Sequence, residues 1–284
     1  QTTGQINDVE RAVLVTRVST ALTARTSLPD YPTAEQLAAL PTRLTYDDTP
    51  HGAALWHAVP AGRDSTGRPG NVFTHAVLDR GLDRELRSPT PRRPIDFWGW
   101  PGWLRPYGPD QVRVALLPAT GGSDGADSGD AAELDPPVPA ASRLAEAVAF
   151  LFEDDADPVR FPTLALLLDA TVAALAGGLP VLLAAPDLAV APHWLTLVSH
   201  LCPPAVCRRL TFSTYEQISG YQLRSGDTDP AVLTIAAAHD VYDATPDLHT
   251  RRLVVDLADE PERSRPPGAT DDDPTEVWVT SLGQ

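Results

Sequence analysis

The chain contains 284 residues, of which 43% are hydrophobic and 21% are charged. This length and balance predict a globular protein of one large or two smaller domains, and they exclude wholesale disorder, collagen-like repeats and a disulfide scaffold. All 22 basic residues are arginine. The absence of lysine excludes a P-loop lysine, a kinase lysine and Schiff-base chemistry. None of the remaining motifs identifies a reaction.

The net charge of −16 is concentrated in two segments. Residues 124–135 carry five acids and no base, and residues 256–276 carry eight acids and two arginines. The rest of the chain therefore keeps a net charge of only about −5, which indicates acidic solvated loops rather than an acidic binding surface. The other arginines are too dispersed for binding of nucleic acid, which needs clustered cations. We expect no nucleic-acid partner.

Membrane insertion and metal binding are not expected either. The longest uncharged apolar stretch, residues 170–186, is interrupted by Gly177 and Pro180, and it predicts a helix, a turn and a strand rather than a membrane span. Charged residues close to the start of the chain interrupt any signal peptide, so a cytoplasmic location is expected. Cys202 and Cys207 are the two cysteines, and they predict reduced thiols rather than a zinc site. No cofactor and no metal are expected.

The first part of the chain combines helical and strand patterns. Apolar spacing predicts a helix over residues 7–25, and Thr33 with Gln36 resembles a capping box that begins a short second helix. Residues 95–103 concentrate four aromatic side chains, and residues 112–117 predict a strand. Turn-forming residues separate three earlier strand-like segments, which predict an antiparallel meander: residues 43–46, 54–59 and 71–78.

The second part alternates helices with strands. It follows residues 119–139, which are almost entirely Gly, Ala, Ser, Asp and Pro and cannot bury enough apolar surface to offset their ordering entropy. Helices are predicted over residues 142–152, 163–176 and 193–201. Strands are predicted over residues 181–184, 210–213, 232–236, 253–256 and 277–280. This alternation is typical of an α/β domain whose central strands are parallel and buried.

The predicted fold class is therefore α/β in two domains. Residues 1–118 form an α+β domain with the antiparallel meander, and residues 119–141 form a flexible acidic linker. Residues 142–284 form an α/β domain with a partly parallel sheet and an acidic loop at residues 256–276.

One polar group stands out in the run GRDSTGRPGNVFTHAVL, residues 62–78. The strand period of two places Asn71 and His75 on one face, and Arg68 precedes them in a glycine-rich turn. Arg68, Asn71 and His75 could together bind an anion. The alternative is a hairpin turn that satisfies its own backbone groups, with His75 as a hydrogen-bonded core residue.

Other clusters carry weaker signals. Residues 239–249 contain histidines and aspartates of the types that bind divalent ions, but their spacing matches no familiar site. Ser213 follows a strand without a nucleophile elbow around it. The aromatic group at residues 97–103 could form a partner surface, although such groups are more often part of the core.

Four segments carry a resemblance to a known family: SLPDYPTAEQLAALPTRLTY, GRDSTGRPGNVFTHAVL, RPIDFWGWPGW and PPAVCRRLTFSTYE. They resemble the actinobacterial family named GTPase-associated protein 1, specifically its second type of N-terminal domain with the adjoining middle domain. The resemblance runs from about Ser27 to about Glu216. It implies a role beside a GTPase encoded nearby in NTP-dependent conflict or defence systems, and it supplies no catalytic residues.

Residues 166–212 are also similar in element order to the central part of eukaryotic DENN modules. In those modules a longin-like first half and an α/β second half together bind small GTPases and promote nucleotide exchange. The similarity implies a longin-like first domain.

The leading hypothesis is a noncatalytic adaptor or scaffold that acts with a GTPase in a bacterial conflict or signalling system. The first alternative is a DENN-like guanine nucleotide exchange factor, which needs no protonatable residue of its own because it acts by stabilising the nucleotide-free state. In both, Trp98, Trp100 and Arg105 are expected to anchor the partner, because aromatic and arginine side chains dominate interface hot spots.

The second alternative is a hydrolase. It would use His57 or His75 with Asp64 as its acid–base pair. This hypothesis requires the side chains to converge in one open pocket, and it fails if His75 is buried against apolar neighbours.

Overall fold

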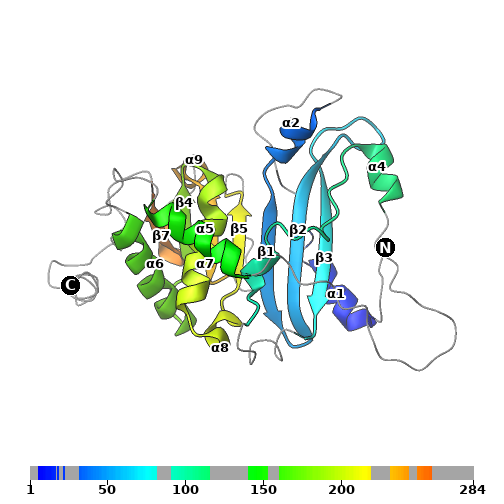
Figure 1. The fold of residues 1–284 in the computed structure, drawn as a ribbon. Helices are drawn as coiled ribbons and strands as arrows, with labels where there is room; N and C mark the ends of the chain where they lie inside the picture. The colour runs from blue at the N-terminus through cyan, green and yellow to red at the C-terminus, as the bar shows by residue number, and fades with distance from the viewer. Residues whose placement is uncertain are drawn as a thin grey trace.

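A computed structural model describes residues 6–16, 18, 22, 32–81, 91–115, 140–152, 160–218, 231–242 and 248–257. Its seven strands form a single mixed sheet in the order β3-β2-β1-β5-β6-β4-β7 (Figure 1). The strands are β1 (Arg43–Thr49), β2 (Gly52–Gly62), β3 (Asn71–Asp79), β4 (Val181–Ala185), β5 (Phe212–Glu216), β6 (Leu233–Ala237) and β7 (Leu253–Asp256). Helices and this mixed sheet together confirm the predicted α/β class.

The first three strands form the predicted antiparallel meander. A tight turn joins β1 to β2, and its Gly52 has φ +134°, a conformation that residues with a side chain rarely adopt. A Cβ at this glycine would lie 2.7 Å from the carbonyl oxygen of Asp79, so only glycine lets β3 approach the turn closely. Both faces of β2 are buried between flanking segments.

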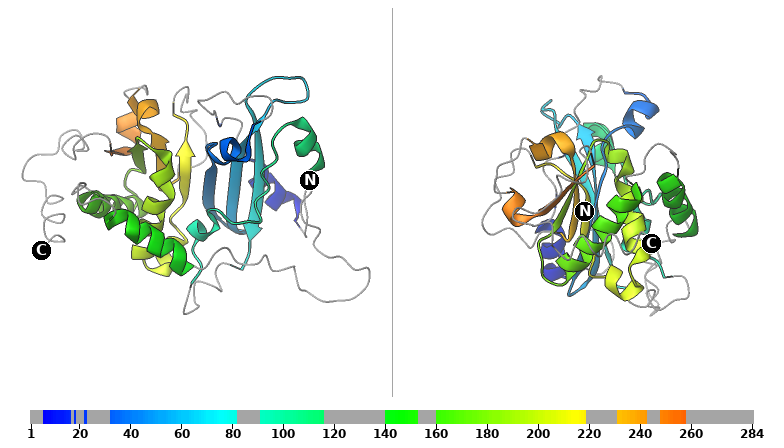
Figure 2. Two further views of the ribbon diagram at one scale, coloured as in Figure 1. Left: turned by 45° about the horizontal axis from the view of Figure 1, so that its top comes forward. Right: turned by 90° about the vertical axis from the view of Figure 1, so that its left-hand side faces the viewer.

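The remaining strands β5, β6, β4 and β7 run parallel to one another, as the alternating pattern predicted. All five residues of β4 are buried, which is expected for a parallel strand covered on both faces. Figure 2 shows the longer helices on one face of these strands and the short α9 and α10 on the other. The helices are α5 (Ala140–Phe152), α6 (Arg160–Leu175), α7 (Ala191–Leu201), α8 (Pro204–Cys207), α9 (Ala238–Tyr242) and α10 (Leu248–Arg251), with a 3-10 turn η2 (Leu188–Val190).

The helices of the first part agree with the sequence pattern in two places and contradict it in one. Helix α1 (Asp8–Thr16) lies inside the expected helix, and α2 (Ala34–Ala38) begins at the predicted capping box, in which Thr33 and Gln36 exchange hydrogen bonds. The strand predicted over residues 112–117 is wrong. Helix α4 (Pro109–Val114) occupies residues 112–114 instead, because Pro109 directly follows Gly108 and suits the first turn of a helix; residues 116 and 117 lie outside the described residues.

Several predicted features lie outside the described residues. They are nearly all of the expected linker at residues 119–141, the acidic segment beyond Leu257, and the strand expected over residues 277–280. Ala140 and Ala141, which were included in the expected linker, belong to α5.

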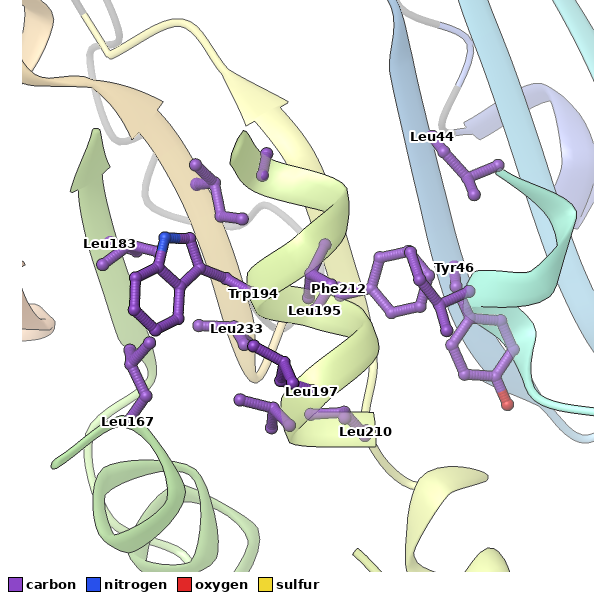
Figure 3. Packing of buried hydrophobic residues seen from close by; sticks show 14 of the residues in the cluster. Leu44, Tyr46, Leu167, Leu183, Trp194, Leu195, Leu197, Leu210, Phe212 and Leu233 are labelled. Carbon is purple, nitrogen blue, oxygen red and sulfur yellow. The ribbon is translucent and has the colours of Figure 1, made fainter. Parts of the chain in front are cut away.

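The two parts of the sheet meet where β1 pairs antiparallel with β5. Thr45 lies opposite Ser213 and Tyr46 opposite Phe212, and the Tyr46 and Phe212 rings are 5.7 Å apart. A single apolar cluster crosses this junction, from Leu44 to the side chains around Trp194 on α7 (Figure 3). Strands from both parts therefore share one core.

A buried arginine strengthens the same junction from one face. Arg93 precedes the 3-10 turn η1 (Pro94–Phe97), and its Nη1 donates hydrogen bonds to the carbonyl oxygens of Ser199 and Cys202 and to the sulfur of Cys207. These carbonyls belong to the C-terminal end of α7, where helical carbonyls lack partners within the helix. The backbone N–H of Arg93 also donates to the buried carboxylate of Asp96 at 2.7 Å.

We expect Arg93→Ala to lower the free energy of unfolding by about 3 kcal/mol, because it leaves the buried carbonyls of Ser199 and Cys202 without their charged donor. Urea denaturation of the full chain measures this change. Arg113→Ala is the matched control, because the contact that Arg113 makes among the described residues is an exposed ion pair with Asp110. It should change stability by less than about 0.5 kcal/mol, and equal effects of the two variants would contradict the role of Arg93.

Candidate functional site

The buried face of the meander holds a pair of histidines under a tryptophan. His57 on β2 lies directly opposite His75 on β3. The ring of Trp103 stacks on His57 with centroids 5.0 Å apart and meets His75 edge-on at 5.1 Å. The indole N–H donates to the carbonyl of Phe97 at 2.7 Å, which fixes the ring in place. The arrangement places two titratable groups inside an aromatic cluster.

Burial determines the charge of both histidines. It lowers the pKa of His57 to about 3, and the positive charges of Arg105 and His75 act in the same direction. It also lowers the pKa of His75 to about 4. The backbone N–H of Leu104 donates to Nδ1 of His75 at 3.2 Å, so the ring proton of neutral His75 lies on Nε2. Neither ring nitrogen of His57 has a hydrogen-bond partner among the described residues.

The predicted polar group is divided between a turn and the core. Asn71 and His75 share one face of β3, but Arg68 lies in the exposed turn between β2 and β3. Within this turn, Oδ1 of Asp64 accepts hydrogen bonds from the backbone N–H groups of Thr66 and Arg68. The geometry is that of the alternative interpretation, a turn that satisfies its own backbone next to a buried, hydrogen-bonded histidine.

The hydrolase hypothesis lacks the geometry it requires. His75 is buried against Trp103, and Asp64 is engaged in the turn. The turn begins at the end of the strand where Asn71 lies, and His75 is four residues further along β3, a distance of about 13 Å at ~3.3 Å per residue. An acid–base pair needs hydrogen-bond contact, of roughly 2.6–3.2 Å.

The expected aromatic anchors differ in accessibility. Trp100 is only 5% exposed and packs edge-on against Phe97 and Trp103, and its role as a partner anchor stays a prediction. Trp98 is half-buried, and its carbonyl accepts a hydrogen bond from Arg143. Arg105 is exposed and remains a residue that a partner could reach. The aromatic group is mainly core because the meander needs a cover on this face.

The other candidates form no catalytic or metal site among the described residues. There, no group of three or more His, Cys, Asp or Glu side chains is arranged to hold a metal ion. The hydroxyl of Ser213 is buried and donates to the carbonyl of Tyr215 at 3.0 Å. Burial raises the pKa of both cysteine thiols. No helix within the described ranges is long and apolar enough to cross a membrane.

An exposed apolar face on α5 and α6 was missed by the sequence analysis. The rings of Phe152 and Phe161 are 66% and 50% exposed and contact each other with centroids 5.3 Å apart. Val148, one helical turn before Phe152, is 39% exposed, and Val172, eleven residues after Phe161 and on the same side of α6, is 57% exposed. The sequence of α6 could have indicated this face. The helix is apolar around most of its circumference, a composition typical of a helix covered on all sides.

Together these features define an α/β protein with one mixed sheet, buried polar clusters and an exposed aromatic face. Comparison with known proteins shows the family. The chain belongs to the GTPase-associated protein 1 family: residues 2–120 match its N-terminal domain of type 2, and residues 144–223 match its middle domain. The resemblance inferred from the four sequence segments is thereby confirmed.

Curated relatives come from two strains of Mycolicibacterium smegmatis, MKD8 and mc(2)155. Both are named "Putative ESX-1 scaffolding and assembly protein SaeB". Each is 39% identical to this chain over 233 residues, which is 82% of the chain and 26% of the relative. The chain thus spans about a quarter of the length of these relatives. No solved structure matches it significantly.

We expect the free energy of unfolding to fall as the pH is lowered below about 6.5. The unfolded chain protonates its histidines near this pH, whereas His57 and His75 stay neutral in the fold until about pH 3 and 4, so the stability present above pH 6.5 is lost progressively. The loss should be on the order of 1 kcal/mol per pH unit for each histidine. Denaturation curves between pH 7 and pH 5 measure the slope. His57→Phe keeps a ring against Trp103 and should give a shallower slope, and an unchanged slope would contradict the assignment.

Proposed function

We propose that this chain is a noncatalytic scaffold module that binds a GTPase within a conflict or signalling system of the bacterial cytoplasm. Three observations support the proposal. Both matched domains belong to a family named for association with a GTPase. Relatives that share most of this chain carry a name that describes scaffolding and assembly. The exposed apolar face on α5 and α6 is the observation that carries it, because it provides a surface for a protein partner.

This face has the properties of an interaction hot spot. Its core is a contacting pair of phenylalanines, and a monomeric protein rarely exposes such a pair beside further apolar side chains. Burying each ring would contribute about 1.5–3 kcal/mol. Four acids occur in the sequence directly after Phe152, between the two rings. The face therefore suits a partner with an apolar centre.

A scaffold and an exchange factor would use the same kind of surface. An exchange factor accelerates nucleotide release by binding the nucleotide-free GTPase more tightly than the loaded form, which requires binding selectivity alone. The DENN-like order of an antiparallel first part and an α/β second part keeps this alternative open to test. The two roles differ in one observable, the rate of nucleotide release.

The experiment is a calorimetric titration of the full chain with the GTPase encoded beside it, in its GDP-bound, GTP-bound and nucleotide-free states. We expect binding in at least one state. Phe152→Ser combined with Phe161→Ser should raise Kd at least tenfold, because both exposed rings are removed without disturbing the core. The control Val114→Ser removes an equally exposed apolar side chain from α4, outside this face, and should leave Kd unchanged.

The outcomes separate the possibilities. Absence of binding in every nucleotide state would contradict a GTPase partner. Equal Kd values for the double variant and the wild-type chain would show that the GTPase does not bind at the face on α5 and α6. The rate of nucleotide release from the GTPase, measured at a saturating concentration of this protein, distinguishes a scaffold from an exchange factor. An unchanged rate indicates a scaffold, and an accelerated rate indicates exchange activity.

A further inference from the structure

The edge strand β3 carries backbone groups that are available for pairing. In an antiparallel sheet, successive residues direct their N–H and C=O groups alternately to the two neighbouring strands. The backbone N–H of Leu44 donates to Oγ1 of Thr214, so the backbone groups of Leu44 point toward β5 and not toward β2. The registers of β1 with β2 and of β2 with β3 then fix which residues of each strand point to which neighbour. It follows that the odd-numbered residues of β3 pair with β2. The N–H and C=O groups of Val72, Thr74, Ala76 and Leu78 then face away from the sheet.

These four residues are not paired elsewhere in the described part of the chain. None of the backbone hydrogen bonds outside the regular strand ladders involves them. The edge thus presents a continuous row of donors and acceptors.

Edge strands usually carry a device that prevents pairing with another chain, such as a proline, a charge, a bulge or a very short length. The opposite edge has two of these devices, because β7 contains only four residues and ends at Asp256. By contrast, β3 contains nine residues, with no proline and no charged residue between Val72 and Leu78. Its register with β2 is regular from Val72 to Asp79, and most of its side chains are only half-buried.

We infer that β3 pairs with β3 of a second copy of this chain, antiparallel and across a two-fold axis at His75. This register places Val72 opposite Leu78, Phe73 opposite Val77, and Thr74 opposite Ala76 of the second copy. The strand is thus self-complementary about its centre, as an isologous two-fold interface requires. All four outward-facing residues fall at hydrogen-bonded positions of the new ladder.

The ends and the centre of β3 favour this register over its neighbours. Asn71 lies opposite Asp79, so no like charges meet. A shift of two residues would place either Asp79 opposite Phe73 or Asn71 opposite Val77, so a polar group would replace an apolar partner. At the axis, the two His75 rings are neutral near pH 7 and do not repel each other.

The second copy, rather than another protein, is the occupant indicated by this self-complementarity. The β3 edge and the apolar face on α5 and α6 lie at opposite ends of the molecule (Figure 1). A dimer formed through β3 would therefore leave both copies of that face accessible. The inference is independent of the identity of the partner that binds there.

Sedimentation equilibrium of the full chain over a range of concentrations tests the pairing. We expect a mass about twice 30.4 kDa for the wild-type chain. Thr74→Pro removes an outward-facing N–H and should yield the monomer mass with a retained circular dichroism spectrum, because its bonds to β2 are not involved. Thr74→Val is the matched control; it keeps a β-branched side chain of similar shape and the N–H, and should remain dimeric.

Cysteine cross-linking tests the register directly. Oxidation of an equimolar mixture of Asn71→Cys and Asp79→Cys chains should yield a disulfide-linked dimer, because these positions lie opposite each other across the axis. Either variant alone should not cross-link through this position. A monomeric wild-type chain, a dimer that persists in Thr74→Pro, or a dimer without cross-linking in the mixture would each overturn the inference.

Discussion

Antiparallel pairing of β1 with β5 is the contact on which the rest of this structure depends. Only Thr45 with Ser213 and Tyr46 with Phe212 pair along the backbone, so side chains complete the junction. The hydroxyl of Tyr46 donates to the carbonyl of Arg208, and the Arg208 guanidinium donates to Asp48 at 2.9 Å. Arg93 adds its bonds to the end of α7 on one face of the sheet. Because one apolar cluster extends across this junction, the meander and the parallel strands form one continuous sheet and core.

Buried polar groups in this protein act mainly in packing. His57 and His75 have residue types that catalysis often uses, but the ring of Trp103 covers them and burial keeps them neutral. Asp96 is likewise buried, at 1% exposure, and accepts a hydrogen bond from the backbone N–H of Arg93. Asp64 and His75 are close in the sequence, but an extended strand separates them in space. Closeness in the sequence is therefore weak evidence for an acid–base pair when the intervening residues form a strand. Removing these groups from water costs free energy, and the surrounding aromatic packing and hydrogen bonds offset that cost.

The surfaces available for interaction lie at the two ends of the sheet. At one end, α5 and α6 expose Phe152 and Phe161, and at the other β3 forms the edge of the sheet in the described part of the chain. A continuous core between the two ends limits their relative motion, since close-packed interiors deform little. Such a geometry suits a scaffold, whose role is to hold bound proteins at a defined separation, and it needs no catalytic group. The relatives named for scaffolding and assembly are about three times as long as this chain, and it corresponds to one part of them.

The sequence alone determined the features that depend on neighbouring residues. The capping box at Thr33 and Gln36 was evident from their spacing, and β7 begins and ends where its apolar run predicted, because caps and strand periodicity arise from contacts within a few residues. Tertiary structure decided the rest. Tyr46 and Phe212 are paired across more than half of the chain, and no local pattern indicates which strands will be neighbours. The burial of Trp100 and the exposure of Phe152 also depended on which elements cover them, because apolar side chains have the same sequence signature in a core and on an open face.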